Sequence, residues 1–480
     1  MIPALSLVSI LAFASSGPAA KQEPAAKQEP AAPRRPSIVL IVSDDLGYGE
    51  VGCYGQRKIR TPRIDELARQ GMLFTDFYAG APVCAPSRCV LMTGKHLGHA
   101  TIRDNKEHKP EGQAPLAESD VTIAQLLKAA GYATGGFGKW GLGYPDSVGD
   151  PFHKGFDRFF GYNCQRHAHN YYPGWLWDDH RKLDLEGNSG GVTGKQYSAD
   201  LITDAALRFL ESHRREPFFL FVPSTLPHLS LQVPRESLAE YEGKFDETPY
   251  HGRSYLPNET PRATYAAMIS HLDRSVGRIL DKLDELRLGE STFVFFTSDN
   301  GPTHLKEQVD VDFFGSAGPF RGLKGSVFEG GIRVPAIARW PARVPAGSRT
   351  STISGFVDLM ATLCGIASID PAPGTDGVSL VPTLTGEGRQ VQHDYMFWDF
   401  PGYGGQLAVR RGKWKAVRVG MRKNPEARLQ LFDLEADPSE SRDVAAEHPE
   451  VAKKMAEIMI EARVEPDEPS FRFGVYGGRR

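Results

Sequence analysis

The sequence predicts a three-layer α/β fold built on a large, mixed central sheet. Two short apolar runs share one design: Ile38–Ser43 ends at a pair of aspartates, and Thr292–Ser298 ends at an Asp-Asn pair. Runs of this length, rich in β-branched and aromatic residues, are typical of fully buried strands. Helical patterns lie between them, and this alternation predicts a sheet covered by helices on both faces.

The other elements of this domain follow in chain order. A helix is predicted over Pro62–Gln70, because Thr61 can cap its start and Gly71 can end it. Pro217–Val222 reads as another buried strand, and Thr264–Leu286 carries apolar residues at helical spacing. Ligands of open α/β sheets bind at the carboxyl edge, so we expect the functional residues where these strands end.

The pattern changes after the Gly- and Pro-rich stretch Pro371–Gly386. Gln406–Val419 and Leu429–Leu434 predict short strands of an antiparallel sheet, and Pro449–Arg463 predicts a helix packed on them. We therefore expect a larger domain over residues 37–385 and a smaller α+β subdomain over residues 386–480.

The N-terminal residues resemble an export signal. Residues 1–20 combine an apolar stretch, Ile2–Phe13, with small residues after it, and the stretch is too short to span a bilayer. A buried first strand or helix is the alternative, but the next segment argues against it, since AAKQEP occurs twice in a polar, low-complexity linker over residues 21–36. We expect an exported protein, periplasmic or extracellular, with no integral membrane segment in the mature chain.

Composition and charge exclude several classes of function. With 40% hydrophobic and 24% charged residues the chain is an ordinary globular protein. The formal net charge of -3 provides no field that would gather nucleic acid or an anionic membrane, so neither is expected as a partner. The five cysteines are scattered, and their pairing cannot be deduced.

The most specific motif is Cys84-Ala85-Pro86-Ser87-Arg88, followed by Leu91-Met92-Thr93-Gly94. A buried thiol at the start of a helix is the simplest interpretation of this cysteine on its own. The motif, however, is similar to the signature of the formylglycine-dependent type I sulfatases. In that family the cysteine is oxidised after translation to formylglycine, which implies a separate maturation enzyme as a partner.

Further motifs of that family occur in the family's order along nearly all of the chain from residue 37 onward. They are Asp44–Gly49, Gly138–Trp140, Pro227-His228, Thr297–Gly301, Arg321–Gly325, Glu329–Pro335 and Leu431–Asp437. Several independent motifs in order are more specific than any one of them. The resemblance implies an alkaline-phosphatase-like catalytic domain and the hydrolysis of sulfate esters.

Two of these motifs supply the residues of a metal site. Asp44, Asp45, Asp299 and Asn300 offer three carboxylates and an amide, all oxygen donors, which suit a hard cation. One such pair could be a turn or a helix cap. Two pairs at the ends of two buried strands favour a metal, because uncompensated carboxylates repel one another. We expect Ca²⁺, with Mg²⁺ as second choice, and the resemblance adds the modified Cys84 as a ligand.

The cationic residues of the motifs fit the chemistry of a sulfate ester. Hydrolysis builds negative charge on the leaving oxygen, so a site needs fixed cations, and Arg88, Lys139 and Lys324 supply them. Each alone would more simply be a solvated surface charge, but all three lie in Gly-rich or apolar motifs, where an unpaired cation is costly. By resemblance, His228 and Lys324 protonate or stabilise the leaving alcohol.

The chain departs from the family's pattern at Gly141, where a histidine commonly follows the first lysine by two residues. In the family that histidine is a candidate base for the elimination of sulfate. His167 or His169 could replace it, although histidines in an aromatic loop are more often structural or in contact with substrate. The departure also motivates the alternative of a catalytically silent protein that binds sulfated glycans.

The substrate is expected to be a sulfated carbohydrate, such as a galactose or N-acetylgalactosamine sulfate, by similarity to bacterial polysaccharide sulfatases. Tyr162–Trp177 is rich in Asn, His, Tyr and Trp, which can stack on a sugar or form a packed lid. Arg103 and Glu329 are candidate contacts to sugar hydroxyls, together with His167 and His169. A formylglycine-dependent phosphonate or phosphate monoester hydrolase is the alternative activity.

Overall fold

The computed structural model describes Met1, Ser9 and residues 35–477. Apart from Met1 and Ser9, the predicted signal peptide lies outside the described residues, as do residues 21–34 of the predicted linker. From Arg35 onward the chain forms one compact unit.

A ten-stranded sheet is the centre of this unit, with the order β11-β2-β10-β9-β1-β8-β4-β5-β6-β7. Neighbouring strands pair in parallel from β9 through β1, β8 and β4 to β5, whereas β10 runs antiparallel to both β9 and β2, and β6 antiparallel to β5 and β7. The sheet is therefore mixed, as predicted. Its strands are β1 (Ser37–Ser43), β2 (Met72–Phe74), β4 (Ala133–Lys139), β5 (Arg158–Tyr162), β6 (Trp175–Asp178), β7 (Arg181–Asp184), β8 (Phe218–Pro223), β9 (Thr292–Ser298), β10 (Ala336–Arg339) and β11 (Ser348–Thr350).

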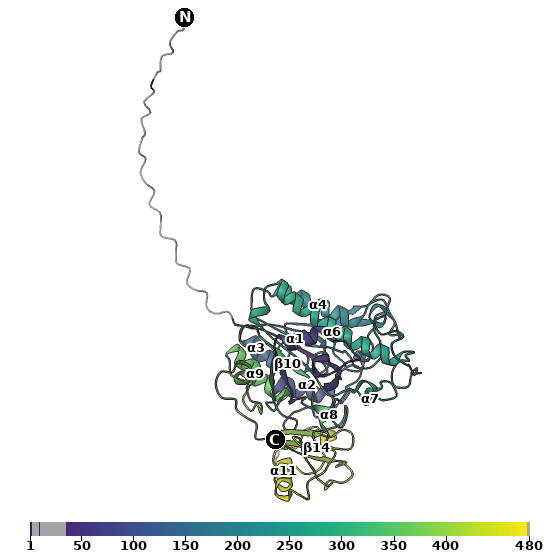
Figure 1. Ribbon diagram of the computed structural model, residues 1–480, viewed down its shortest axis with the longest axis vertical. Coiled ribbons are helices and arrows are strands. Elements are labelled where there is room, and N and C mark those ends of the chain that lie inside the picture. Colours follow the sequence, from purple (N-terminus) through teal and green to yellow (C-terminus); the bar gives the residue numbers. More distant parts are fainter. Residues whose placement is uncertain (2–8, 10–34, 478–480) are drawn as a thin grey trace. The chain divides into compact units, whose positions relative to one another are not determined.

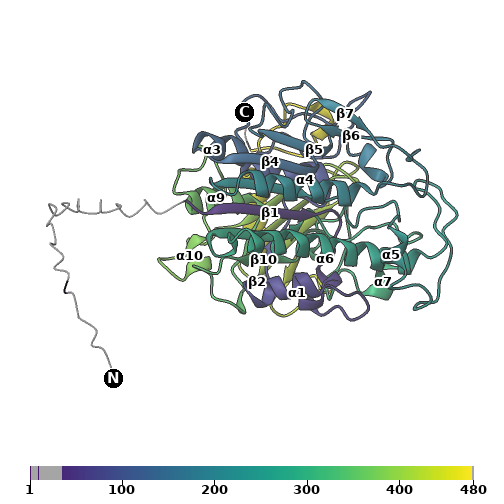
Figure 2. The same cartoon turned by 90° about the horizontal axis from the view of Figure 1, so that it is seen from above.

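Helices cover both faces of the sheet, which gives the three layers. Successive side chains of β1 enter different cores: Ile38 and Leu40 pack in one, and Val39 and Ile41 in the other. One layer contains α1 (Pro62–Arg69), α4 (Ser198–Ser212), α5 (Arg235–Leu238) and α6 (Pro261–Glu285), and the other contains α2 (Cys84–Thr93), α3 (Ile123–Ala129) and α9 (Leu359–Ala367). Figure 2 shows α4 and α6 side by side along β1.

The C-terminal region adds the predicted small antiparallel sheet. It consists of β13 (Met396–Phe400), β14 (Gln406–Arg411), β15 (Trp414–Val419) and β16 (Gln430–Asp433), and α11 (Pro449–Glu461) packs on β14 and β15. Figure 1 shows β14 and α11 together at the yellow end of the chain. The Nε1 of Trp398 in β13 donates to the carbonyl of Ala79, 3.0 Å away, so this sheet is joined directly to the larger domain.

The remaining elements are short. They are β3 (Phe77–Tyr78) paired with β12 (Ser354–Gly355), the helices α7 (Val311–Phe314), α8 (Glu329–Ile332) and α10 (Val381–Thr385), and the 3₁₀ helix η3 (His167–His169). Among the helices of residues 35–477, none combines the length and the apolar character that a membrane span requires.

The sheet register determines where the site forms. Strands β1 and β9 are parallel neighbours, with Ser43 opposite Ser298. The polar pairs that follow both strands therefore emerge side by side at the carboxyl edge. Strand β4 runs in the same direction and ends at Lys139, so this lysine reaches the same edge.

Candidate active site

The two polar pairs meet in a buried cluster at the ends of β1 and β9. The backbone N–H of Asp45 donates to Oδ1 of Asp299 at 3.2 Å, and Nδ2 of Asn300 donates to Oδ1 of Asp45 at 2.8 Å. Asp45 has a φ of 64°, a left-handed conformation that costs free energy in a residue with a side chain. The fold holds that conformation and so turns the second carboxylate toward the cluster.

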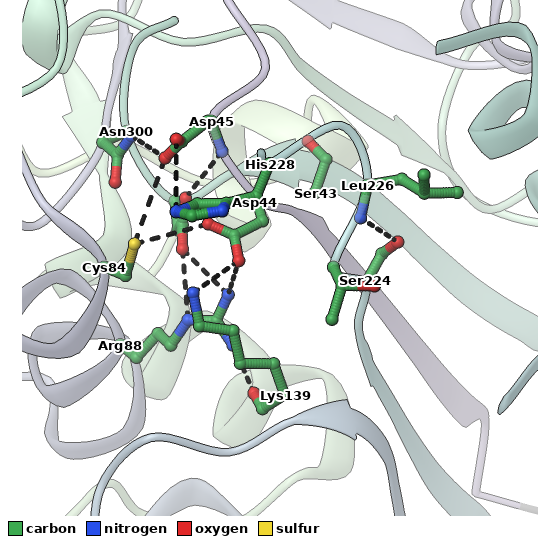
Figure 3. Close-up of polar contacts among 12 residues, drawn as sticks. Ser43, Asp44, Asp45, Cys84, Arg88, Lys139, Ser224, Leu226, His228 and Asn300 are labelled. Carbon is green, nitrogen blue, oxygen red and sulfur yellow. Dashed lines mark hydrogen bonds and ion pairs between the residues drawn. The ribbon is translucent and has the colours of Figure 1, made fainter. Parts of the chain in front are cut away.

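Cys84 contributes its side chain to this cluster from α2, in the helix layer that also contains α3 and α9 (Figure 3). It is the first residue of α2, and its side chain is buried. Its Sγ lies 3.3 Å from Oδ1 of Asp44, 4.0 Å from Oδ1 of Asp45 and 3.5 Å from Nζ of Lys324. The sequence motif with the most specific resemblance is thus in contact with both aspartates of the first metal motif.

Each carboxylate of the cluster has a cationic partner. Lys139 Nζ lies 2.6 Å from Asp44, and Lys324 Nζ lies 2.7 Å from Asp45. Arg88 donates from Nη2 and Nε to Asp299 at 2.9 and 3.1 Å. Three negative and three positive side chains therefore balance, and a bound divalent cation would leave the site with an excess of positive charge.

His228 completes the ring of groups. Its Nδ1 contacts the carbonyl oxygen of Leu229, so Nε2 is the nitrogen on the cluster side, 3.6 Å from Asp45. The ring of His169 stacks on it, with centroids 4.8 Å apart and planes 14° apart. Burial lowers the pKa of His228 well below its usual value, and Lys324 lowers it further. The imidazole is therefore neutral before substrate arrives.

The cluster also changes the acidity of its own members. Burial favours a protonated Asp44, but the cations Lys139, Arg88 and Lys324 outweigh burial and hold the pKa of that carboxyl below its usual range. Burial, and then the charge of Asp44, raise the pKa of the Cys84 thiol. Asp44 is thus an anion at neutral pH, whereas the unmodified thiol remains protonated.

The residues present fit a hard cation. The Oδ1 of Asn300 is buried and, within the described part of the chain, has no hydrogen-bond partner. A buried acceptor without a partner is costly, and a metal ion is one group that satisfies it. Asp44, Asp45, Cys84 and His228 each offer one ligand atom, and these four atoms lie within 4.8 Å of one another. The available oxygens, with the carboxylate of Asp299 beside them, are the donors that Ca²⁺ and Mg²⁺ prefer.

A cavity of about 320 Å³ opens above Cys84 and Lys324. Its wall is rich in groups that form hydrogen bonds and in aromatic rings. The lining residues are Asp45, Cys84, Asn105, Glu107, Gln113, Gln165, Arg166, His169, His228, Leu229, Tyr255, Thr303, His304, Leu305, Lys324 and Tyr403. A volume of this size is typical of a small-molecule site.

The two candidate histidines have different positions. His169 lines the cavity, and its ring also lies 5.2 Å from that of Tyr255. His167 is not among the lining residues and packs between Tyr162 and Trp175 instead, with ring centroids 5.0 and 4.1 Å away. Of the two, only His169 is placed to contact a substrate in this cavity.

Arg103 and Glu329 do not lie where the sequence analysis expected them, because neither lines the cavity. Arg103 is fully buried, and its Nη1 lies 2.7 Å from Oδ2 of Asp399 in the C-terminal sheet. Glu329 is also fully buried and lies 2.7 Å from Lys415 and 3.1 Å from Arg333. These residues form ion pairs with the C-terminal sheet or with Arg333, which directly follows α8, so neither is placed to contact a substrate in this cavity.

Several cavity residues were missed by the sequence analysis. The C-terminal region contributes Tyr403 to the cavity wall, whereas Trp398 is buried and donates to the carbonyl of Ala79. Tyr255, His304 and Tyr403 lie in irregular segments far apart in the chain, with no motif around them. Asn105 and Gln113 follow the signature helix, but no pattern in the sequence separates them from surface residues.

Comparison with known proteins identifies the family. A family model described as Sulfatase matches residues 36–369. The chain belongs to the sulfatase family. The match confirms the resemblance seen in the motifs. As a sulfatase the protein is a sulfuric ester hydrolase. Its catalytic domain has the alkaline-phosphatase-like fold. A second model, described as N-sulphoglucosamine sulphohydrolase, C-terminal, matches residues 323–465.

Alignments with individual relatives cover most of this sulfatase. Arylsulfatase A of Bos taurus is 32% identical over 463 residues, which cover 87% of this chain and 84% of the relative. N-acetylgalactosamine-6-O-sulfatase of Bacteroides thetaiotaomicron is 30% identical over 497 residues, covering 88% and 92%. The crystal structure of Ps i-CgsB in complex with k-i-k-neocarrahexaose aligns with a TM-score of 0.75 at 28% identity, covering 89% of this chain and 92% of that one.

Proposed function

We propose that this sulfatase hydrolyses sulfate esters of carbohydrates, with formylglycine made from Cys84 as the nucleophile and a divalent cation beside it. The observation that carries the proposal is the position of Cys84 Sγ, in contact with Asp44, Asp45 and Lys324 at the base of the cavity. Conversion of Cys84 requires a maturation enzyme as a partner.

The proposed cation ligands are Asp44, Asp45, Asp299, Asn300 and the oxygen that replaces Sγ at residue 84. The Oδ1 of Asn300, which has no hydrogen-bond partner among the described residues, supports this set, and the carboxylate and amide oxygens favour Ca²⁺ over zinc. Mg²⁺ is the second choice. When bound, such a cation lowers the pKa of a neighbouring hydroxyl and fixes its orientation.

Formylglycine accounts for a buried cysteine that is a poor nucleophile as a thiol. Its raised pKa keeps the thiol protonated, and an S-sulfated cysteine would have no easy route to release sulfate. The hydrate of the aldehyde supplies one hydroxyl that attacks sulfur with loss of the alcohol, and a second whose deprotonation expels sulfate and regenerates the aldehyde.

The remaining side chains bind the sulfate and assist departure of the alcohol. Lys139 and Arg88 are held rigidly by Asp44 and Asp299, so their positive charge is in place before substrate binds. Lys324 and His228 line the cavity, and we assign them to the bridging ester oxygen. Lys324 stabilises the charge that develops there. Nε2 of the neutral His228 bears no proton, because Nδ1 donates to Leu229, so it takes the proton from the attacking hydroxyl and passes it to the departing alcohol.

The proposed substrate is a galactose or N-acetylgalactosamine that carries a sulfate ester and fits the cavity beside Cys84. The similarity to relatives named N-acetylgalactosamine-6-sulfatase and N-acetylgalactosamine-6-O-sulfatase supports this class. Tyr255, Tyr403 and His304 provide rings for stacking, and Asn105 and Gln113 provide amides for hydroxyl groups. We propose that the protein is exported and meets this substrate outside the cytoplasm.

Turnover of matched substrates tests the proposal. We expect release of sulfate from an aryl sulfate to exceed release of phosphate from the corresponding aryl phosphate, and the reverse order would assign the protein to the alternative phosphate or phosphonate activity. Sulfated galactosides and sulfated glucosamines are then compared at equal concentration. Reaction of the glucosamines alone would contradict the proposed sugar.

A further inference from the structure

Gln165 is a buried residue of the cavity whose amide has no assigned role. Its side chain is 6% exposed and lines the same cavity as Cys84 and Lys324. The amide nitrogen is buried and has no hydrogen-bond partner among the described residues. An amide N–H left without an acceptor in a buried position costs free energy, so this group is expected to meet an acceptor that binds in the cavity.

The position of Gln165 follows from the end of the central sheet. Strands β4 and β5 are parallel neighbours with Lys139 opposite Tyr162, and beyond them the N–H of Gly141 donates to the carbonyl of Asn163 at 3.1 Å. Gln165 thus lies beside the strand end that carries Lys139. The next residue, Arg166, is exposed, also lines the cavity, and pairs with Glu107 at 2.6 Å.

Gly141 and Gln165 share one space. A Cβ on residue 141 would lie 3.0 Å from Nε2 and 3.1 Å from Cγ of Gln165, closer than ordinary contacts. Gly141 also has a φ of 74°, which a side chain adopts only with strain. The glycine that departs from the family's pattern therefore leaves room for the glutamine side chain.

We propose that Gln165 is a substrate-binding residue that donates its amide N–H to an oxygen of the sulfate group, and that Gly141 makes this position possible. The inference rests on the proposed function. A sulfate oxygen is the acceptor because Gln165 lines the same cavity as Cys84 and Lys324, beside Gly141, and anionic oxygens form stronger hydrogen bonds than sugar hydroxyls. An amide exchanges no proton here, so Gln165 binds and orients the group and does not act as the base.

Inorganic sulfate is the probe, because it carries the anion without the sugar. Its inhibition constant against aryl sulfate turnover, and its effect on the unfolding temperature, are measured for the wild type and for Gln165→Leu and Gln165→Glu. We expect sulfate to bind about 10-fold more weakly to the leucine variant, and more weakly still to the glutamate variant, whose negative charge repels the anion. Rates are normalised to the fraction of Cys84 converted.

The matched control is Gln56→Leu, a buried glutamine whose amide donates to the carbonyls of Gly49 and Phe314. It should lower stability and leave sulfate affinity unchanged. Unchanged affinity for inorganic sulfate in both Gln165 variants would overturn the inference. If the variants then bind the unsulfated sugar more weakly, Gln165 contacts the sugar and not the sulfate group. If the wild type releases no sulfate, the proposed function fails, whereas the shift in unfolding temperature with inorganic sulfate still tests Gln165.

A double-mutant cycle tests the shared space. Gly141→Ala alone should weaken sulfate binding, because the added methyl group displaces the glutamine side chain. In a protein that already carries Gln165→Ala, the same substitution should weaken sulfate binding less. Additive effects of the two substitutions on sulfate affinity would contradict the assigned role of Gly141.

Discussion

Two buried clusters of this sulfatase both pair carboxylates with cationic side chains, but only one of the two borders the cavity beside Cys84. In the active site, Arg88 pairs with Asp299 and Lys139 with Asp44. At the junction with the C-terminal sheet, Asp399 lies 2.7 Å from Arg103 and 3.1 Å from Arg463, and both arginines also donate to backbone carbonyls. The first cluster borders a cavity and contains Oδ1 of Asn300, an acceptor with no hydrogen-bond partner in the described part of the chain. An adjoining cavity and an unsatisfied donor or acceptor, and not the presence of buried charges, distinguish a reactive site from a structural one.

The largest expected effect comes from removing the nucleophile of the first cluster. Cys84→Ala should lower turnover of an aryl sulfate by about 10⁴-fold, since loss of a covalent nucleophile removes the main reaction route. The unfolding temperature should change little, because the side chain is small. Residual turnover near the wild-type level would show that the active-site cluster works without residue 84.

The second cluster should affect stability instead. Arg103→Met breaks a buried ion pair, and we expect the free energy of unfolding to fall by about 3 kcal/mol. The turnover of the protein that remains folded should be unaltered. Urea unfolding and initial rates measured on the same preparations separate these effects. A large loss of substrate affinity at unchanged stability would instead show that Arg103 contacts the substrate.

A smaller effect distinguishes the clusters by their response to a cation. At Ca²⁺ concentrations about 100 times the dissociation constant, binding should stabilise the converted protein by about 2.7 kcal/mol relative to chelated protein. Asp299→Asn should reduce this gain, and Arg103→Met should retain it. Unfolding temperatures with and without Ca²⁺ or Mg²⁺ provide the measurement, and no gain with either ion in the wild type would contradict the proposed cation site.

Sequence reasoning reached one cluster and not the other for a physical reason. The ends of β1 and β9 are determined locally by short apolar runs, and parallel pairing of the two strands brings Asp44 and Asp299 together. The helix Pro62–Arg69 and the strand Thr292–Ser298 also lie within a residue or two of their predicted bounds.

The fate of Arg103 depends on long-range packing. Its partner Asp399 is 296 residues away, so no local pattern shows whether the guanidinium meets a carboxylate or a sugar. Gln165 is similar, because its importance appears only where the strand end beside Gly141 and the wall of the cavity come together.

The central claim is that residue 84 acts as an aldehyde in this cluster. The most direct test measures turnover of an aryl sulfate, in excess Ca²⁺, on preparations whose conversion of Cys84 has been determined by mass spectrometry of the peptide that contains it. We predict that the rate is proportional to the converted fraction and extrapolates to zero when residue 84 is entirely thiol. Full turnover in a preparation that contains only the thiol would contradict the account.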